Sequence, residues 1–254
     1  DSSVPPYRNS VNAARDLAEL RTELLLADLE LVSTRIERLE KQVHKPTKTQ
    51  AQDKAELALQ KKLQEAIESE RPISSAIDSE AELEMIKSFG FLTQKPMAIA
   101  VNVGEGDLGK IPDLGDSVDG GMPAVSICAK LGYELAQLDA ESRAEFMTDL
   151  GITESLTGKF VRGCYSAMGL VSFLTVSSDE VHAWTIEQGT VAHDAAGKVH
   201  TDIKRGFIRA ETFGYDDLRT LGSEKALKAA GKIRLEGKEY IVQDGDVIYF
   251  RFNI

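Results

Sequence analysis

The sequence predicts an α+β chain with several domains: a helical hairpin, part of a parallel α/β sheet, and a compact β-rich module at the C-terminus. Three observations support this fold class. Residues 15–43 carry a heptad pattern, two short apolar strands lie among helices between residues 80 and 150, and six strand-like runs follow residue 169. A chain of 254 residues is long enough for one large domain or two to three small ones.

The composition is typical of a soluble globular protein, with 42% hydrophobic and 28% charged residues. The formal net charge of -11 gives no global electrostatic reason to expect nucleic-acid binding. No apolar run approaches the roughly 20 residues of a membrane helix, and residues 1–10 do not resemble a signal peptide. Two cysteines, Cys128 and Cys164, are too few for a disulfide framework. We therefore expect a cytoplasmic protein with reduced cysteines and no membrane partner, and we favour a monomer.

After a tail at residues 1–14, the heptad pattern predicts the first helix. Its apolar residues are spaced by 4, 3, 4, 3 and 4 positions: Leu25, Leu29, Val32, Ile36, Leu39 and Val43. A polar break with Pro46 follows, and then a second amphipathic helix at residues 55–68 with Leu59, Leu63 and Ala66 on one face. The pattern predicts an antiparallel coiled-coil hairpin over residues 15–79, either a packing arm or a docking surface.

Residues 80–169 are expected to hold the edge of a parallel α/β sheet. A helix at residues 80–91, with Leu83, Ile86 and Phe89 on its apolar face, precedes a strand at residues 97–101. A loop with six glycines and two prolines spans residues 104–123, a second strand covers residues 125–128, and a single helix is expected at residues 130–150. Two strands do not make a whole sheet, so this region is predicted to be incomplete by itself.

Residues 170–254 are predicted to form one compact module. LVSFLTV and EVHAWTI form a hairpin around the SSD turn, and the helical run TVAHDAAGKV follows. GFIRAETF is a strand, YDDLRTL and SEKALKAA are short helices, and KIRLEG, KEYIVQ and VIYFRF are strands separated by turns at residues 237–238 and 244–246. A hairpin, a helix and returning strands within about 85 residues indicate a β-grasp fold.

One segment, KPMAIAVNVGEGDLGKIPD at residues 95–113, contains two overlapping motifs. Gly104-x-x-x-x-Gly109-Lys110 has the spacing of a phosphate-binding loop, but Ile111 stands where a Mg²⁺-binding Ser or Thr is required. Pro112 follows where a helix should begin, and acidic residues lie inside the loop. We therefore do not interpret this segment as a phosphate loop.

The second motif is Asn102-x-x-Glu105, placed directly after a strand. An asparagine amide both donates and accepts hydrogen bonds and a carboxylate accepts them, so the pair can recognise the edge of a purine base. The spacing matches the Asn-Lys-x-Asp motif of P-loop GTPases, although Val103 replaces the lysine. By itself the motif is also consistent with a turn in which Asn102 caps the end of the strand.

Over residues 15–254 the chain resembles the YchF/Obg-like ATPase family, a branch of the Obg-related P-loop NTPases. The most specific segments are RTELLLADLE, KPMAIAVNVGE, AAGKVHTDIKRGFIRAE and AGKIRLEGKEYIVQDGDVIYFRFNI. The resemblance implies a nucleotide-binding domain with an inserted helical hairpin, followed by a TGS domain of ubiquitin-like β-grasp fold. Residues 80–169 would be the C-terminal part of a P-loop NTPase sheet, and residues 170–254 the TGS domain.

By this resemblance, Asn102 and Glu105 recognise the base, with Val103 beside the ring, and the glutamate favours ATP over GTP. Cys128, Ala129 and Lys130 resemble the last nucleotide loop of the family, whose backbone amide approaches the base. Gly132 replaces an acid that is common in the family, which puts only a packing contact in doubt.

In the family, the phosphate loop, the Mg²⁺-binding residues and the Asp-x-x-Gly motif all precede the hairpin, and residues 1–14 do not match them. We therefore expect the phosphate-binding half to precede this chain in an intact protein that binds ATP, or GTP, with Mg²⁺. The chain alone is expected to be inactive, and no catalytic residue can be assigned. The implied role is ribosome-, translation- or stress-related regulation. The alternative is a non-catalytic ribosome- or RNA-binding adaptor built from the hairpin and the TGS domain.

The four histidines do not show the spacing of a metal site, and we expect none. His200-Thr201-Asp202 resembles a TGS signature; it could be a helix stop with turn hydrogen bonds from Thr201 and Asp202, or an edge that faces a ligand or RNA.

A basic cluster of Lys204, Arg205 and Arg209 surrounds Phe207 and could contact RNA or the ribosome, or be a solvated strand face. Residues 171–254 hold 11 basic and 13 acidic residues, a net of -2, which leaves -9 for the rest of the chain. Phe207 and Trp184 are expected in the core.

Overall fold

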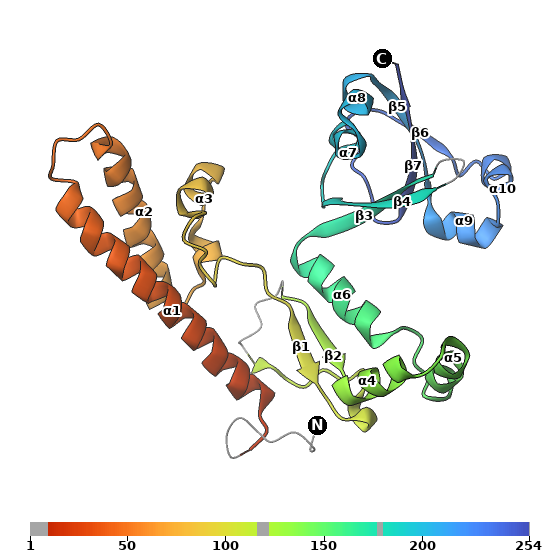
Figure 1. The fold of residues 1–254 in the computed structure, drawn as a ribbon, viewed down its shortest axis with the longest axis horizontal. Helices are drawn as coiled ribbons and strands as arrows, with labels where there is room; N and C mark the ends of the chain where they lie inside the picture. The colour runs from red at the N-terminus through yellow and green to blue at the C-terminus, as the bar shows by residue number, and fades with distance from the viewer. Residues whose placement is uncertain (1–9, 116–121, 177–179, 254) are drawn as a thin grey trace. The chain divides into compact units, whose positions relative to one another are not determined.

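The computed structural model describes residues 10–115, 122–176 and 180–253. They fall into two compact units, one ending at Phe160 and the other beginning at Val161, so the boundary lies within helix α6 (Leu156–Ala167) (Figure 1). Across the described ranges, none of the helices combines the length and apolar character needed to cross a membrane. Most of the tail predicted at residues 1–14 lies outside the described residues.

The first unit opens with the two predicted helices, α1 (Ala13–Gln42) and α2 (Gln50–Glu68), which pack side by side (Figure 1). The Asn12 side chain caps α1 by accepting a hydrogen bond from the Arg15 N–H at 3.0 Å. The heptad residues in the C-terminal part of α1, next to the turn, are buried: Val32, Ile36, Leu39 and Val43. Leu25 and Leu29, nearer the start of the helix, are half-buried. Arg35 joins the helices through two bonds to Glu56, at 2.6 and 2.7 Å.

After the 3-10 turn η1 (Ile73–Ala76), helix α3 (Glu80–Ile86) is five residues shorter than predicted. The chain turns at Gly90, whose φ of 66° is left-handed, and the turn places Phe91 fully inside the hydrophobic core. Phe89 stacks on Phe91 with ring centroids 5.2 Å apart, while Leu83, predicted on the apolar face, is 39% exposed. Burial of Phe91 therefore ends the helix earlier than its apolar pattern suggests.

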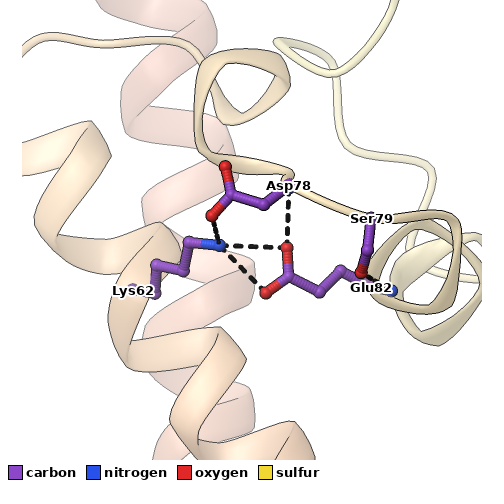
Figure 2. Close-up of polar contacts among 4 residues, drawn as sticks. All are labelled: Lys62, Asp78, Ser79 and Glu82. Carbon is purple, nitrogen blue, oxygen red and sulfur yellow. Dashed lines mark hydrogen bonds and ion pairs between the residues drawn. The ribbon is translucent and has the colours of Figure 1, made fainter.

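Helix α3 is attached to α2 by a polar network (Figure 2). The Lys62 ammonium contacts Asp78 at 2.7 Å and both carboxylate oxygens of Glu82 at 2.9 Å. Glu82 also accepts from the Asp78 N–H at 2.8 Å, and Ser79 caps α3 by accepting from the Glu82 N–H. These bonds lower the pKa of Glu82, the backbone bond from Asp78 more than the one from Lys62.

Strands β1 (Ile99–Asn102) and β2 (Ala124–Ile127) pair in parallel, as expected for the strands predicted at residues 97–101 and 125–128. The register places Asn102 opposite Ile127. The 3-10 turn η2 (Glu105–Asp107) follows β1, and part of the predicted loop, residues 116–121, lies outside the described residues.

The single helix predicted for residues 130–150 is wrong. The chain forms α4 (Ala129–Gln137) and α5 (Ala140–Asp149), because Leu138 is extended and Asp139 caps α5 by accepting from the Glu141 and Ser142 N–H groups. Phe146 is therefore 48% exposed rather than in register with the α4 core. Helix α6 was not predicted.

The second unit is built on a five-stranded sheet in the order β4-β3-β7-β5-β6. Strand β3 pairs in parallel with β7, and the other neighbours are antiparallel. All five strands lie within two residues of their predicted bounds, and the predicted turn at residues 177–179 lies outside the described residues. The strands are β3 (Leu170–Val176), β4 (Val181–Glu187), β5 (Phe207–Gly214), β6 (Arg234–Glu236) and β7 (Asp246–Phe252).

Two hydrophobic clusters cover this sheet. One joins Phe173, Ile186 and Ala210 to α7 (Ala192–Val199), with Ile203 of α8 (Thr201–Arg205) at its margin. The other joins Phe213 and Val247 to Leu227, and involves α9 (Tyr215–Leu221) and α10 (Glu224–Ala229). Successive residues of a strand point to opposite faces of the sheet, so neighbouring residues of β5 can pack in different clusters.

The strand predicted at residues 238–243 is wrong: this segment forms a single bridge, between Ile241 and Val191. Asp246, 3% exposed, holds the segment in its irregular path by accepting from the Tyr240 hydroxyl at 2.7 Å and the Gln243 N–H at 2.9 Å. Burial and the bond to Asp246 raise the pKa of Tyr240. The Asp246 carboxylate thus acts together with backbone bonds to residues 190–193, among them the Ala192 N–H to the Tyr240 carbonyl at 2.7 Å.

Candidate functional site

The side chain of Asn102 joins the two predicted base-recognition loops. Asn102 ends β1, and its Oδ1 accepts a hydrogen bond from the N–H of Ala129 at 3.0 Å, at the first residue of α4. The contact is possible because β1 and β2 are parallel neighbours, so the loops at their carboxyl ends emerge at one edge. Crevices at such edges are the usual ligand sites of open α/β sheets.

The bond to Ala129 determines which hydrogen-bonding groups of Asn102 remain available to a ligand. Its Oδ1 is occupied by Ala129, while its Nδ2 has no partner among the described residues. Both Asn102 and Ala129 are exposed. The same bond shows the structural capping role that the motif also suggested, and it occupies the Ala129 amide of the second loop.

Glu105 and Lys130 face each other across the two loops, with Oε1 and Nζ 3.7 Å apart. Each side chain is more than half exposed, so solvent screens this attraction and its contribution to stability is small. The pair nevertheless places one acceptor and one cation next to Asn102.

The remaining predicted base-site residues are buried rather than presented. Val103 is 8% exposed, and its N–H extends the ladder to the Ile127 carbonyl at 2.8 Å. Cys128 is 1% exposed and packs with Leu131 and Leu135 in a small cluster. The buried side chains of Val103 and Cys128 therefore hold the two loops in position from the interior of the unit.

Sequence reasoning missed two residues that hold the first loop in place. Ser126, fully buried in the middle of β2, accepts a hydrogen bond from the Gly109 N–H at 3.0 Å. Leu108 packs against the cluster around Cys128. A serine inside an apolar strand was the available signal, because a buried hydroxyl requires a partner.

A cleft of about 400 Å³ adjoins this loop on the side of α4 and the start of α6. Its lining is mixed, with apolar walls from Leu108, Leu131 and Ile152 and polar groups from Glu105 and Lys159. The cleft lies within the first unit and shares Glu105 with the candidate site.

The geometry after Gly104 agrees with the rejection of a phosphate loop. Lys110 folds back to Asp107 at 2.9 Å and to the Gly106 carbonyl at 3.3 Å, and residues 111–114 are not helical. The lysine therefore neutralises an acid of its own loop, and residues 111–114 do not supply the helix N-terminus that binds an anion in a phosphate loop.

A third missed residue, Asp28, lies within the RTELLLADLE segment. Its fully buried carboxylate accepts from the Leu92 N–H at 2.8 Å and from the N–H and hydroxyl of Thr93, both at 2.7 Å. These bonds tie α1 to the segment just before β1. Because the partners lie 64 and 65 positions away, no local pattern in the sequence predicts them.

The predicted basic cluster does not form one surface. Lys204 pairs with Asp194 at 2.8 Å and Arg205 with Asp202 at 3.0 Å, both cations belonging to α8. Arg209 lies on β5 opposite Arg251 and precedes Ala210, which points into the α7 cluster, so Arg209 faces the other side of the sheet.

Phe207 is 7% exposed in the cluster beneath α7, as expected, whereas Trp184 is half-buried and donates to the Thr175 hydroxyl at 2.8 Å.

His200 separates α7 from α8 and caps the second helix. Its Nδ1 accepts from the Asp202 N–H at 3.2 Å, so the cap comes from the histidine rather than from the predicted side chains of Thr201 and Asp202. Within the described ranges, His, Cys, Asp and Glu do not gather in any group of three that could hold a metal ion.

Comparisons with known proteins agree with one another. The YchF-GTPase_C family model, described as a protein of unknown function (DUF933), matches residues 170–253. Ribosome-binding ATPase YchF of Bacillus subtilis (strain 168) is 38% identical over 261 residues, covering 100% of this chain and 70% of that protein. Obg-like ATPase 1 of Homo sapiens is 36% identical over 262 residues, covering 100% of this chain and 66% of that protein.

Among solved structures, the Schizosaccharomyces pombe YchF GTPase superposes with a TM-score of 0.74 at 32% identity, covering 99% of this chain and 69% of that one. A GTP-binding protein from Pyrococcus horikoshii OT3 matches at a TM-score of 0.51 and 18% identity, which supports the fold alone. Identity above 30% along the entire chain is decisive, and the chain belongs to the YchF/Obg-like ATPase family.

Proposed function

We propose that the edge formed by Asn102 and Glu105 recognises the adenine base in a nucleotide-binding, ribosome-associated ATPase. The observation that carries this proposal is the Asn102–Ala129 bond, which joins both loops at the carboxyl ends of two parallel strands. Asn102 keeps its Nδ2 donors for a base nitrogen, and the Glu105 carboxylate can accept from an exocyclic amino group. Lys130 and Ala129 complete the edge, while Val103 and Cys128 support it from the interior.

Hydrolysis needs more than base recognition. Phosphoryl transfer depends on phosphate-binding groups and Mg²⁺, which supply most of the electrostatic stabilisation. The 254 residues contain no Gly-x-x-x-x-Gly-Lys followed by Ser or Thr. We therefore propose that these loops act together with a phosphate-binding segment upstream, and that the chain alone does not turn over ATP or GTP.

Ribosome association is the second part of the proposal. It is supported by the names of the bacterial relatives, which are ribosome-binding ATPases. The proposed organisation is a hairpin at residues 15–79, the C-terminal part of the nucleotide domain at 80–169, and a TGS domain at 170–254. The sheet order β4-β3-β7-β5-β6, with its parallel central pair, supports a β-grasp fold for the last domain. A cytoplasmic, monomeric protein fits this role.

Calorimetry with ATP and GTP on the protein that includes the upstream coding sequence tests base recognition. Asn102→Ala and Glu105→Gln should each weaken ATP by about 1–3 kcal/mol, the usual size of a well-placed polar contact to a base. Asp107→Asn, an acid of the same loop that is paired with Lys110, is the matched control and should leave affinity unchanged. Unaltered ATP and GTP affinities in the Asn102 and Glu105 variants would show that this edge does not recognise the base.

The adaptor alternative predicts a different result. Ribosome binding would then proceed in the absence of nucleotide, and the reading frame upstream of Asp1 would not encode a Gly-x-x-x-x-Gly-Lys-Ser or -Thr segment.

A further inference from the structure

The turn of the helical hairpin carries a group of lysines without acidic residues among them. Residues 41–52 include Lys41, Lys45, Lys48 and one histidine but no Asp or Glu, in a chain whose formal net charge is -11. All three lysines are exposed. In the described part of the chain no carboxylate pairs with them, and the acid just before them, Glu40, is held by Lys61 at 2.7 Å.

The turn is ordered by its own hydrogen bonds. The Gln50 side chain donates to the Val43 carbonyl at 2.9 Å, and the Lys45 N–H donates to the Gln42 carbonyl at 3.0 Å. The Thr49 hydroxyl donates to Asp53, which is 8% exposed, at 3.3 Å. A fixed backbone reduces the ordering cost of binding, so these lysines are already arranged for a partner.

The turn also lies well beyond the polar contacts that attach the hairpin to the rest of its unit. The end of α1 at Gln42 is 14 positions beyond Asp28 and seven beyond Arg35, which lies over the Phe89 ring, and Lys62 is 12 positions beyond the start of α2 at Gln50. At 1.5 Å per residue, the 14 and 12 positions span about 21 Å and about 18 Å, and the seven positions from Arg35 about 10 Å. The lysines thus lie at the end of a projecting arm.

We propose that Lys41, Lys45 and Lys48 dock this arm on the phosphate backbone of structured RNA. The proposal rests on the ribosome association proposed above and assigns it a contact surface. A lysine without a carboxylate partner can bind a phosphate without first breaking an ion pair. Lys204 and Arg205 of the C-terminal unit are paired with carboxylates, and breaking these pairs would reduce the gain from binding RNA. RNA phosphates match three exposed cations on a turn whose other exposed side chains are mostly polar better than a folded protein surface does.

The test compares two triple variants of the whole chain. Lys41→Gln/Lys45→Gln/Lys48→Gln removes the turn charges. The control removes the same charge from cations that are paired with carboxylates away from the turn, at 2.7, 3.2 and 2.9 Å: Lys87→Gln, Lys232→Gln and Arg251→Gln. Circular dichroism verifies that both retain their helices. Binding is measured to ribosomes by co-sedimentation and to protein-free ribosomal RNA by anisotropy, across a salt series.

For RNA, the turn variant should lose about tenfold or more in affinity at low salt. Its log–log salt slope should fall by about 2–3, because each phosphate contact contributes about 0.7–0.9. The control should follow the wild type. Equal RNA affinities and slopes for wild type and turn variant would overturn the proposal, while ribosome association could persist through another surface.

Two further outcomes separate the proposals. Turn-dependent binding to ribosomes without any binding to free RNA would overturn the RNA assignment in favour of an acidic ribosomal protein. Turn-dependent RNA binding without ribosome binding would support the arm and contradict ribosome association. If the wild type binds neither ribosomes nor RNA, both proposals fail.

Discussion

The two sheets of this protein are stabilised in different ways. The five-stranded sheet of the second unit has a hydrophobic cluster on each face, centred on Phe173 and Phe213. The sheet of the first unit has two strands, in which Ser126 is the one fully buried residue, and a two-stranded sheet is marginal by itself. It relies on single polar contacts such as Ser126–Gly109 and Asp28–Thr93. Apolar burial therefore maintains the C-terminal sheet, and specific long-range hydrogen bonds position the candidate site.

The largest effect is expected from the apolar core. Phe173→Ala should lower the free energy of unfolding of the second unit by about 3–5 kcal/mol, because the ring is fully buried. The chain has a single tryptophan, Trp184, and it lies in this unit, so its fluorescence in a urea titration reports the loss. Phe252→Ala, at a ring 42% exposed, is the control and should change little. Equal losses from the two would contradict a core-dominated sheet.

Asp28→Asn tests the polar anchoring of the first unit. The amide retains one acceptor but directs an NH₂ group at N–H donors of Leu92 or Thr93, which should cost about 2–3 kcal/mol. Far-UV circular dichroism of the hairpin helices should show the loss while the Trp184 transition remains in place. Glu30→Gln, on the exposed face of the same helix, is the matched control. A shift of the Trp184 transition alone would reverse the comparison.

The second unit also contains a buried carboxylate, Asp246, that accepts hydrogen bonds, so polar and apolar contributions can be compared within one sheet. Asp246→Asn should weaken the bonds to Tyr240 and Gln243 and cost about 1–2 kcal/mol, less than Phe173→Ala. Urea midpoints from Trp184 fluorescence measure both variants under one condition. If Asp246→Asn were the more damaging of the two, this sheet too would depend mainly on polar contacts.

The smallest effect should be a dependence on pH at the Glu82 network (Figure 2). The pKa of Glu82 is lower in the folded state, so its stabilisation is complete above the unfolded value, about 4.3, and is lost as the pH falls through the folded value. The urea midpoint of the hairpin helices should therefore decrease from pH 7 to pH 3.5 less in Glu82→Gln than in the wild type. Glu80→Gln, at an exposed acid of the same helix, should behave as the wild type.

The sequence predicted the five strands of the second unit to within two residues, because runs of apolar and β-branched residues bounded by turn residues indicate each of them. The prediction was wrong where a polar group fixes the backbone: Asp139 divides a predicted helix into α4 and α5, and Asp246 holds residues 238–243 in an irregular path.

At the site, the strand-end position of Asn102 was predictable, but its bond to Ala129 needed the parallel register of β1 and β2. Nothing local indicated Asp28, and the basic run around Phe207 suggested a patch that strand alternation divides between two faces.

The bonds between Asp28 and Thr93 also couple the hairpin mechanically to β1. The lysine turn lies about 21 Å from Asp28 along α1, and β1 begins six residues after Thr93. The five residues between Thr93 and β1 span at most about 18 Å when fully extended, so β1 can move only a limited distance relative to Thr93. A force applied at the turn is therefore transmitted towards the strand that ends in Asn102, through Asp28 together with the Lys62 network and the apolar core around Phe91.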